Sequence, residues 1–338
     1  MAPSFAKLGA AAALAYVYAS GAAAYAPSES YQLVESYDPS NFFTKWTFFV
    51  SDFESTDHMA VSPTHGFVNF RNQQDAANLE LIKTLGDEVY IGVDSTRSHV
   101  VGRDSVRLES ITKYNGGLII AHFNHIPKAV CGAWPAFWMY GPNWPNGGEV
   151  DIYEQWNLDN NFNAFHTGAP ADVGACTLKA STFTSPVRTS NCFVYAAGQW
   201  DNEGCAAVPS APINPPSTGA AIYATEWTDD VFRIWTWPAA SAPPDVLAGE
   251  PNPAHWGLPN FSIDSSSCDI GRAFKDMKMV LNIDFCGDAA GNPGIWGADP
   301  NEKCYGETGY SWCPTYVDFS PHDFAEVFWK IKDIKVYE

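Results

Sequence analysis

Positive charge is scarce in this sequence of 338 residues. Lys and Arg number 19 against 38 Asp and Glu, which gives a formal net charge of −19. A polyanion such as nucleic acid, or an anionic membrane surface, is repelled by such a chain. The composition is compatible with a neutral partner, and we expect no nucleic-acid partner and no membrane partner.

Long hydrophobic runs are absent beyond the first 26 residues. Within residues 1–26, Lys7 precedes a short apolar stretch that is followed by small residues, which is typical of a secretory signal peptide. The stretch is short for a membrane span and no basic cluster follows it, so a membrane anchor is the weaker alternative. We expect cleavage after Ala24 or Ala26, and a secreted, extracellular chain over residues 27–338.

Closely spaced cysteine pairs are also missing. No Cys-x-x-Cys pair occurs, which argues against a zinc site. The eight cysteines are an even number behind a signal peptide, which predicts disulfides formed in an oxidising compartment. Their count leaves about 105 possible pairings. A single glycosylation sequon, Asn260-Phe261-Ser262, agrees with secretion.

Helical periodicity is scarce, and the chain shows no internal repeat and no linker between two halves. Ser320 and Pro321 predict the start of one short helix, with Ser320 as its N-cap and Pro321 at its first position. Asp229-Asp230 predicts a hairpin turn between two strands. Many short runs of β-branched and aromatic residues, separated by turn residues, predict an all-β sandwich or barrel in one domain. The predicted strands are Phe42–Val50, Phe67–Phe70, Val89–Val93, Ser105–Tyr114, Gly117–His125, Ala136–Met139, Val150–Gln155, Ala164–His166, Ala221–Trp227, Val231–Trp237, Met277–Phe285 and Lys332–Tyr337.

One segment combines a turn, a strand and three acids. Residues 144–156 read W-P-N-G-G-E-V-D-I-Y-E-Q-W. Residues i and i+2 of a strand share a face, so Glu149 and Asp151 point one way and the apolar residues point the other. Strict alternation would bury Glu154 on the apolar face at a high cost. An extra residue in a β-bulge returns it to the acidic face, and we predict such a bulge at or beside Tyr153.

Three carboxylates gathered in this way cannot all ionise easily, so at least one pKa should rise. Glycoside hydrolysis needs one ionised carboxylate and one protonated carboxyl, about 5–5.5 Å apart in retaining enzymes. The alternative to a catalytic site is an acidic strand face that is simply exposed to solvent. The apolar alternate face, the Gly-Gly turn and the nearby tryptophans favour a site. The chain has 13 Trp, 15 Tyr and 21 Phe, many of which must form the core while others could stack on sugar rings.

Two segments, G-A-W-P-A-F-W at Gly132–Trp138 and the acidic segment at Trp144–Glu154, resemble the active-site strand region of glycoside hydrolase family 16. The E-x-D-x-x-E spacing is similar to that of the laminarinase-type members, in which this strand carries a bulge. The similarity spans roughly Asn69 to Glu338. Further segments resemble the fungal members in particular: Thr64–Phe70, Gly102–Arg107, His166–Gly168, Cys268–Gly271, Asn282–Asp288 and Val336–Tyr337.

The resemblance implies a concanavalin A-like β-jelly-roll sandwich of two antiparallel sheets, with a glucan-binding groove on the concave face. It also implies retaining hydrolysis of β-1,3 or mixed β-1,3/1,4 glucans by an endo-acting enzyme. At matching positions Glu149 is the nucleophile, and Glu154 is the general acid and then the general base. Asp151 would hydrogen-bond to Glu149 and tune its proton. The acids alone do not say which glutamate attacks.

The resemblance also implies sugar-binding residues. His166 lies where the family places a histidine near the scissile sugar, although a structural histidine is the alternative. Trp134, Trp138 and Trp144 are similar to groove tryptophans, with core packing as an alternative for Trp138. A residue that departs from the family pattern is Tyr153, which stands where an aliphatic residue is common.

Three further residues complete the predicted site. Asn69 and Arg103 match positions that resemble sugar-contacting residues, although Arg103 could be a plain surface arginine. Trp256, in the Pro-rich stretch, would close the groove.

We expect no cofactor, and no cluster of residues identifies a metal ion, although a structural calcium ion would be compatible with this fold. We expect the enzyme to act as a monomer on β-glucan.

Two alternatives to a hydrolase remain open at the level of the sequence. A glucan-binding lectin on the same sandwich would grip the polysaccharide without cutting it. A transglycosylase would pass the glycosyl group to another sugar instead of water, with the same acids. The presence of all three acids argues against the lectin. The acid motif is the same for hydrolysis and transglycosylation, so the sequence does not separate these two reactions.

Overall fold

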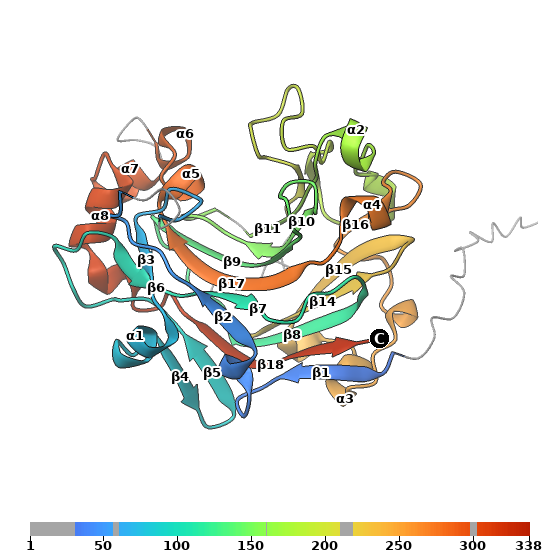
Figure 1. Cartoon of the computed structure of the whole chain (residues 1–338), viewed down its shortest axis with the longest axis horizontal. Coiled ribbons are helices and arrows are strands. Elements are labelled where there is room, and N and C mark those ends of the chain that lie inside the picture. Colours follow the sequence, from blue (N-terminus) through green and yellow to red (C-terminus); the bar gives the residue numbers. More distant parts are fainter. Residues whose placement is uncertain (1–30, 57–60, 160, 210–218, 298–302) are drawn as a thin grey trace, which may run out of the picture.

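The computed structural model describes residues 31–56, 61–159, 161–209, 219–297 and 303–338. The predicted signal peptide and its cleavage sites lie outside these residues. Within them, two large antiparallel sheets pack face to face, which confirms the predicted jelly-roll sandwich (Figure 1). None of the described helices has the length and apolar character that crossing a membrane would require.

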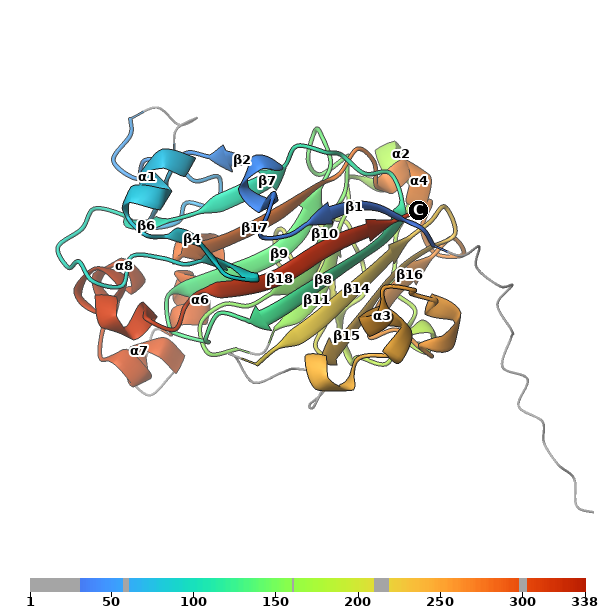
Figure 2. The same cartoon turned by 90° about the horizontal axis from the view of Figure 1, so that it is seen from below.

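The first sheet forms the convex side of the sandwich. It is ordered β16-β15-β14-β8-β18-β5-β4, and β1 pairs with β18 (Figure 2). Its turn at Asp229-Asp230 joins β14 to β15, as predicted, with Thr228 N–H donating to the Val231 carbonyl at 2.9 Å. The strands are β1 (Leu33–Tyr37), β4 (Ile82–Leu85), β5 (Glu88–Ile91), β8 (Gly117–His125), β14 (Ala221–Trp227), β15 (Val231–Pro238), β16 (Phe261–Asp264) and β18 (Trp329–Tyr337).

The second sheet curves so that its outer face is concave (Figure 1). Its order is β12-β13-β11-β10-β9-β17-β7-β2, and a separate parallel pair, β3 (Val68–Phe70) with β6 (Arg103–Ser105), lies at one end. The strands of the sheet are β2 (Trp46–Phe49), β7 (Arg107–Ser110), β9 (Ala133–Tyr140), β10 (Glu149–Glu154), β11 (Phe162–His166), β12 (Val187–Thr189), β13 (Cys205–Ala207) and β17 (Lys278–Phe285).

Short helices join the strands and stand around the edges of the sheets. They are the α-helices α1 (Gln73–Asn78), α2 (Pro170–Val173), α3 (Pro244–Ala248), α4 (Ile270–Ala273), α5 (Gly287–Ala290), α6 (Pro293–Trp296), α7 (Lys303–Thr308) and α8 (Cys313–Phe319), and the 3-10 turns η1 (Phe42–Thr44), η2 (Ala180–Thr182), η3 (Ala239–Ser241), η4 (Pro253–His255) and η5 (Pro321–Phe324). The helix predicted after Ser320 is η5, which has proline at its first turn but no side-chain cap from Ser320.

The core lies between the two sheets and is built from alternate residues of their strands. Phe123 of β8 meets Phe137 of β9 with ring centroids 5.6 Å apart, and both side chains are buried. Val150 and Ile152 of β10 are fully buried in the same cluster. Because side chains alternate along a strand, this packing fixes which residues of the second sheet face the concave side.

The eight cysteines all lie in the described part of the chain and form four disulfides, which confirms the predicted oxidised state. The pairs Cys131–Cys304 and Cys286–Cys313 attach α7 and α8 to the end of the concave sheet. The others join the loops beside β11: Cys176–Cys268 and Cys192–Cys205.

Two departures from the sequence expectations have a clear local cause. The predicted strand at Phe42–Val50 starts as the 3-10 turn η1, because the Asp38 carbonyl accepts the N–H of Phe42 at 2.8 Å and bends the chain there. The sequon residue Asn260 is only 6% exposed, and its amide oxygen accepts the Thr236 N–H at 2.6 Å. The folded structure therefore holds the sequon side chain inside and not on the surface.

Candidate active site

The acidic strand β10 contains the predicted bulge. Opposite β9, Asp151 pairs with Trp138 and Tyr153 pairs with Phe137, so Ile152 is one residue too many. The ladder with β11 shifts at the same place. Ile152 and Tyr153 therefore both pack into the core, where they are 0% and 2% exposed. This extra residue returns the next side chain to the concave face and confirms the bulge prediction.

Tyr153 shows how the bulge accommodates an aromatic residue. Its ring meets Tyr223 of the opposite sheet at 5.9 Å and Trp329 at 5.2 Å between centroids. Its hydroxyl donates to Gln155 Oε1 at 2.7 Å, so the buried phenol has a partner. The large side chain thus anchors the bulge in the core between the sheets.

Each of the two glutamates is held by a tryptophan. Trp134 Nε1 donates to Glu154 Oε1 at 2.6 Å, and Trp144 Nε1 donates to Glu149 Oε2. Trp134 comes from β9, and Trp144 from the turn before β10. Hydrogen bonds to one oxygen of a carboxylate orient the group and leave its other oxygen free for a substrate.

The third acid, Asp151, lies between the glutamates in sequence and is 3% exposed. Its hydrogen-bond partner is His166 of β11, with Asp151 Oδ2 and His166 Nε2 2.9 Å apart. The resemblance predicted Glu149 as its partner, so the structure corrects this point. The register explains the pair: on β11, His166 lies opposite Glu149 and Ala164 lies opposite Asp151, so a long side chain reaches diagonally to the acid.

The environment moves the pKa values of these groups apart. Burial, opposed by the His166 cation and reinforced by Asp151, raises the pKa of Glu149 to about 7. Burial, followed by the charge of Asp151, raises the pKa of Glu154 well above its usual range. Burial alone would lower the pKa of His166, but Glu149 and Asp151 outweigh it and raise this pKa to about 9. Near neutral pH, Glu149 therefore ionises before Glu154, beside a cationic histidine.

Glu149, Asp151 and His166 each bring one atom of a type that binds metals, and these atoms all lie within 4.8 Å of one another. A histidine must be neutral to bind a metal, whereas the neighbouring carboxylates favour its cation. Its Nε2 atom is also the one that is bonded to Asp151. We therefore interpret the cluster as an acid–histidine site and not as a metal centre.

The concave face continues beyond the acids through residues that the sequence interpretation missed. Trp138 Nε1 donates to Asn282 Oδ1 of β17 at 2.7 Å. The guanidinium of Arg107 lies 5.0 Å from the Trp138 ring centre and pairs with Glu109 at 3.0 Å. Tyr140 donates to Glu109 Oε2 at 3.0 Å. Only the pairing of β9, β17 and β7 brings these residues together, so their separate positions in the sequence gave no signal.

The structure assembles most, but not all, of the predicted sugar-binding residues. Trp134, Trp144 and His166 contact the three acids directly, and Trp138 shares the concave face with them. This arrangement supports their functional interpretation and places Trp138 outside the core cluster.

The other three predicted residues have structural surroundings. Arg103 has no exposed surface, and its guanidinium donates to backbone carbonyls, including that of Asp94 at 2.9 Å. The side-chain amide of Asn69 is bonded within nearby loops, to the Val101 carbonyl at 2.8 Å. Trp256 donates to Asp245 at 2.8 Å and packs on the outer face of the convex sheet. The prediction that Trp256 closes the groove is wrong, and the structure does not bring Arg103 to the site.

Gly204 determines how closely a neighbouring loop can approach His166. A Cβ atom at this position would lie 2.7 Å from His166 Nδ1 and 2.5 Å from the Phe165 carbonyl oxygen. We expect Gly204→Ala to displace the imidazole from Asp151 and to lower kcat about tenfold or more, since a small misplacement of a reacting group is costly. Gly198→Ala is the matched control, because Gly198 also has a positive φ but nothing within 4 Å of its Cβ. Equal kcat values for the two variants would contradict this role.

An antiparallel β-sandwich with paired carboxylates on a bulged strand of its concave face is the architecture of jelly-roll glycoside hydrolases. A family model described as the XgeA-like catalytic domain of glycoside hydrolase family 16 matches residues 53–337. The chain therefore belongs to glycoside hydrolase family 16.

Curated relatives of the chain come from fungi. The chain is 36% identical over 326 residues to an endo-1,3(4)-beta-glucanase of Arthroderma benhamiae, covering 94% of this chain and 67% of that protein. It is 34% identical to a probable endo-1,3(4)-beta-glucanase of Aspergillus fumigatus, covering 92% of this chain and 46% of that protein. The chain thus spans between about half and two thirds of these relatives.

Solved structures give two instructive neighbours. Laminarinase 16A from Phanerochaete chrysosporium, with 6-O-glucosyl-laminaritriose in both donor and acceptor sites, is 31% identical with a TM-score of 0.77, over 92% of this chain and 100% of that chain. An elongating family 16 beta-1,3-glucosyltransferase is 32% identical with a TM-score of 0.77, over 91% of this chain and 100% of that chain.

Proposed function

We propose that this chain is a secreted endo-β-glucanase that cleaves β-1,3 and mixed β-1,3/1,4 glucans with retention of anomeric configuration. The observation that carries the proposal is the bulged strand β10, which presents three acids on the concave face and gives its two glutamates different proton affinities. The named fungal relatives and the disulfides support the substrate class and the oxidising compartment.

In the first step, the ionised Glu149 attacks the anomeric carbon and forms a glycosyl ester. Glu154 gives its proton to the glycosidic oxygen as the bond between that oxygen and the anomeric carbon breaks, so the aglycone leaves as an alcohol. The greater rise in the pKa of Glu154 suits this division, since the acid has to keep its proton while the nucleophile loses its own.

In the second step, Glu154, now a carboxylate, takes a proton from a water molecule. The hydroxide equivalent attacks the anomeric carbon, the ester bond breaks, and Glu149 leaves as a carboxylate. The two inversions give a β-configured product. Asp151 and His166 form a hydrogen-bonded pair beside the two glutamates, and the hydrogen bonds from the tryptophans fix the orientation of the glutamate carboxyl groups.

The experiment that tests the proposal is digestion of laminarin, lichenan and a β-1,4 glucan side by side, with the anomeric signal followed by NMR. We expect short reducing oligosaccharides from the first two, with the β-anomer appearing first. No sugar release, with binding to insoluble glucan retained, would indicate the lectin and overturn the proposal. An α-anomer first would overturn the retaining mechanism.

Transglycosylation is the second candidate function. It is favoured by the likeness to the elongating glucosyltransferase, which is as similar to this chain as the laminarinase. The first step is the same, and a sugar hydroxyl replaces water in the second. Oligosaccharides longer than the starting material would show transfer.

The His166 cation should set where the pH–rate profile lies. Its charge lowers the pKa of both glutamates, so replacing it with a neutral residue should raise both values. For His166→Gln we expect both limbs of the kcat/KM profile to move to higher pH. The acidic limb moves because Glu149 ionises at a higher pH, and the basic limb moves because Glu154 keeps its proton to a higher pH. An unchanged profile, or one shifted to lower pH, would contradict a cationic His166.

A further inference from the structure

The loop 190–204, between β12 and β13, carries aromatic side chains on the protein surface. We call it the aromatic loop. Tyr195 and Trp200 are each 59% exposed, and Phe193 packs edge-on against Tyr195 at 5.9 Å between ring centroids. Exposed tryptophan is uncommon because its large apolar area contacts water, so such side chains often mark a binding surface.

This loop holds its shape by internal bonds. The disulfide Cys192–Cys205 closes its base. The side chain of Gln199 donates to the Gly204 carbonyl at 2.7 Å, and Asn202 N–H donates to the Val194 carbonyl at 2.6 Å. The aromatic side chains are therefore presented on an ordered backbone. Binding a ligand would cost little conformational entropy of the loop, because the loop is already ordered.

The base of the aromatic loop joins the active site through β11. Thr167, the residue after His166, donates its N–H to the Cys192 carbonyl at 2.8 Å and accepts from the Val194 N–H at 3.3 Å. Gly204, at the other end of the loop, lies against the His166 ring. The loop is thus continuous with the strand that carries the site histidine.

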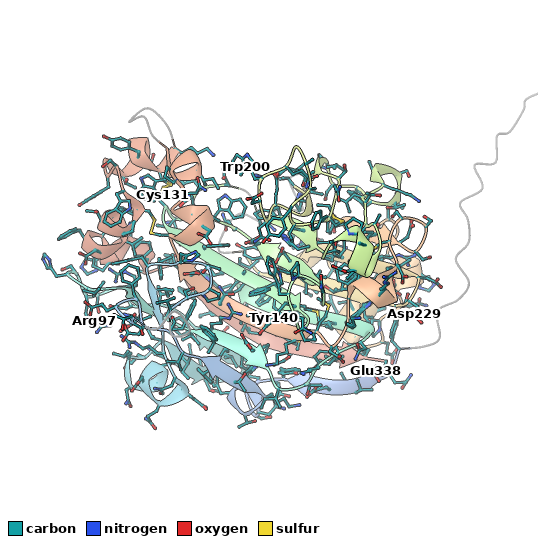
Figure 3. The ribbon with its side chains drawn as sticks, turned by 45° about the horizontal axis from the view of Figure 1, so that its top comes forward. Arg97, Cys131, Tyr140, Trp200, Asp229 and Glu338 are labelled. Carbon is teal, nitrogen blue, oxygen red and sulfur yellow. A yellow bond between two sulfur atoms is a disulfide. The ribbon has the colours of Figure 1, made fainter. Side chains whose placement is uncertain are left out.

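A second chain of contacts leads from the loop to Glu154. Glu203 pairs with Arg188 of β12 at 3.3 Å. The Arg188 guanidinium lies 5.8 Å from the ring centre of Trp156, which meets the Trp134 ring edge-on at 6.3 Å. Trp134 in turn donates to Glu154. Figure 3 shows Trp200 at the upper edge of the molecule, on the side of the concave face.

We propose that the aromatic loop binds glucan on the Glu154 side of the scissile bond. This glucan is the leaving chain in the first step and, in transglycosylation, the acceptor chain in the second. The occupant is a neutral β-glucan chain, whose apolar C–H faces stack on Tyr195 and Trp200. The proposal rests on the proposed function, since Glu154 gives its proton to the oxygen of that departing chain. The strongly negative protein disfavours an anionic polymer at the same surface.

The test compares Trp200→Ala and Tyr195→Ala with the parent enzyme on two substrates. With laminarin, which reaches beyond the site, we expect KM to rise about tenfold, the change that 1.4 kcal/mol corresponds to. With an aryl β-glycoside, whose leaving group is too short to reach the loop, we expect kcat/KM to stay the same. Trp312→Ala is the matched control, because Trp312 is 62% exposed at the start of α8, outside this loop.

The outcomes separate the two proposals. If the parent enzyme releases no sugar from laminarin, the proposed function fails. If the parent cuts laminarin while Trp200→Ala and Tyr195→Ala keep its KM, the aromatic loop is not a glucan surface and only this inference fails. An equal rise in KM for Trp312→Ala, or an equal loss on both substrates, also overturns it. Two separate variants keep the test decisive if one of them fails to fold.

Discussion

Replacing Glu149 with glutamine will abolish glucan cleavage, with kcat lower by about 10⁴-fold or more. The amide has nearly the same shape as the carboxylate and can still accept the hydrogen bond from Trp144. It carries no negative charge, however, and cannot form the glycosyl ester. The measurement is reducing-sugar release from laminarin, with binding to insoluble glucan recorded in parallel.

A control is needed for the effect of losing a buried carboxylate as such. Glu226 of β14 is 5% exposed and pairs with Arg233 at 3.0 Å, on the sheet opposite the site. Glu226→Gln should cut laminarin with a kcat within about threefold of the parent, whatever its effect on stability, because the group lies outside the concave face. If Glu149→Gln retained a tenth of the parent turnover, the nucleophile would have to be another residue.

Replacing Glu154 with glutamine will lower laminarin hydrolysis by about 10²- to 10⁴-fold, the usual range for a general acid–base group. The loss should be smaller in the glycosylation step of a substrate with a good phenolate leaving group, since such a group departs without a proton. Azide should then restore turnover, because it attacks the glycosyl ester without a general base. Kinetics on both substrates, with and without azide, measure these effects.

The two glutamates are distinguished by this pattern of rescue. Azide should give a β-glycosyl azide with Glu154→Gln, since it replaces water in the second displacement. Equal losses on both substrates, with no response to azide, would show that Glu154 does not act as acid and base. The hydrogen bond from Trp134 is kept in this variant, so the tryptophan does not account for the difference.

Local patterns were enough to predict the centre of the site. The alternation of Val150 and Ile152 with the acids identified the buried face of β10, and the position of Glu154 required a bulge. The structure has this bulge, with Ile152 as the extra residue. Strands with strong alternation and clear turns, such as Gly117–His125 and Ala221–Trp227, have the predicted bounds.

Positions that depend on contacts distant in sequence could not be predicted from these patterns. The resemblance predicts that Arg103 contacts sugar, but the carbonyl of Val317, 214 positions away, accepts its side-chain N–H at 3.0 Å. Trp256 is in a Pro-rich stretch that folds over the convex sheet, where its ring meets Trp235 at 5.2 Å. The local sequence does not indicate where these two side chains pack, because more than one surface of the sandwich can bury them.

The partnership of His166 with Asp151 illustrates the same limit. A strand spacing indicates which side chains share a face but not which of them bond across strands. The pairing of β10 with β11 places His166 opposite Glu149, while its ring nitrogen bonds to Asp151. The charge balance that follows from this contact raises the pKa of His166, and the sequence alone did not provide it.

The central claim, that Glu149 is the nucleophile on a bulged acidic strand, can be tested by trapping the intermediate. The parent enzyme would be incubated with a 2-deoxy-2-fluoro-laminaribiosyl fluoride, and the labelled peptide would be sequenced by mass spectrometry. The slow hydrolysis of the fluorinated ester should leave one disaccharide attached to Glu149. A label on Glu154, or inactivation without any ester on β10, would contradict the account.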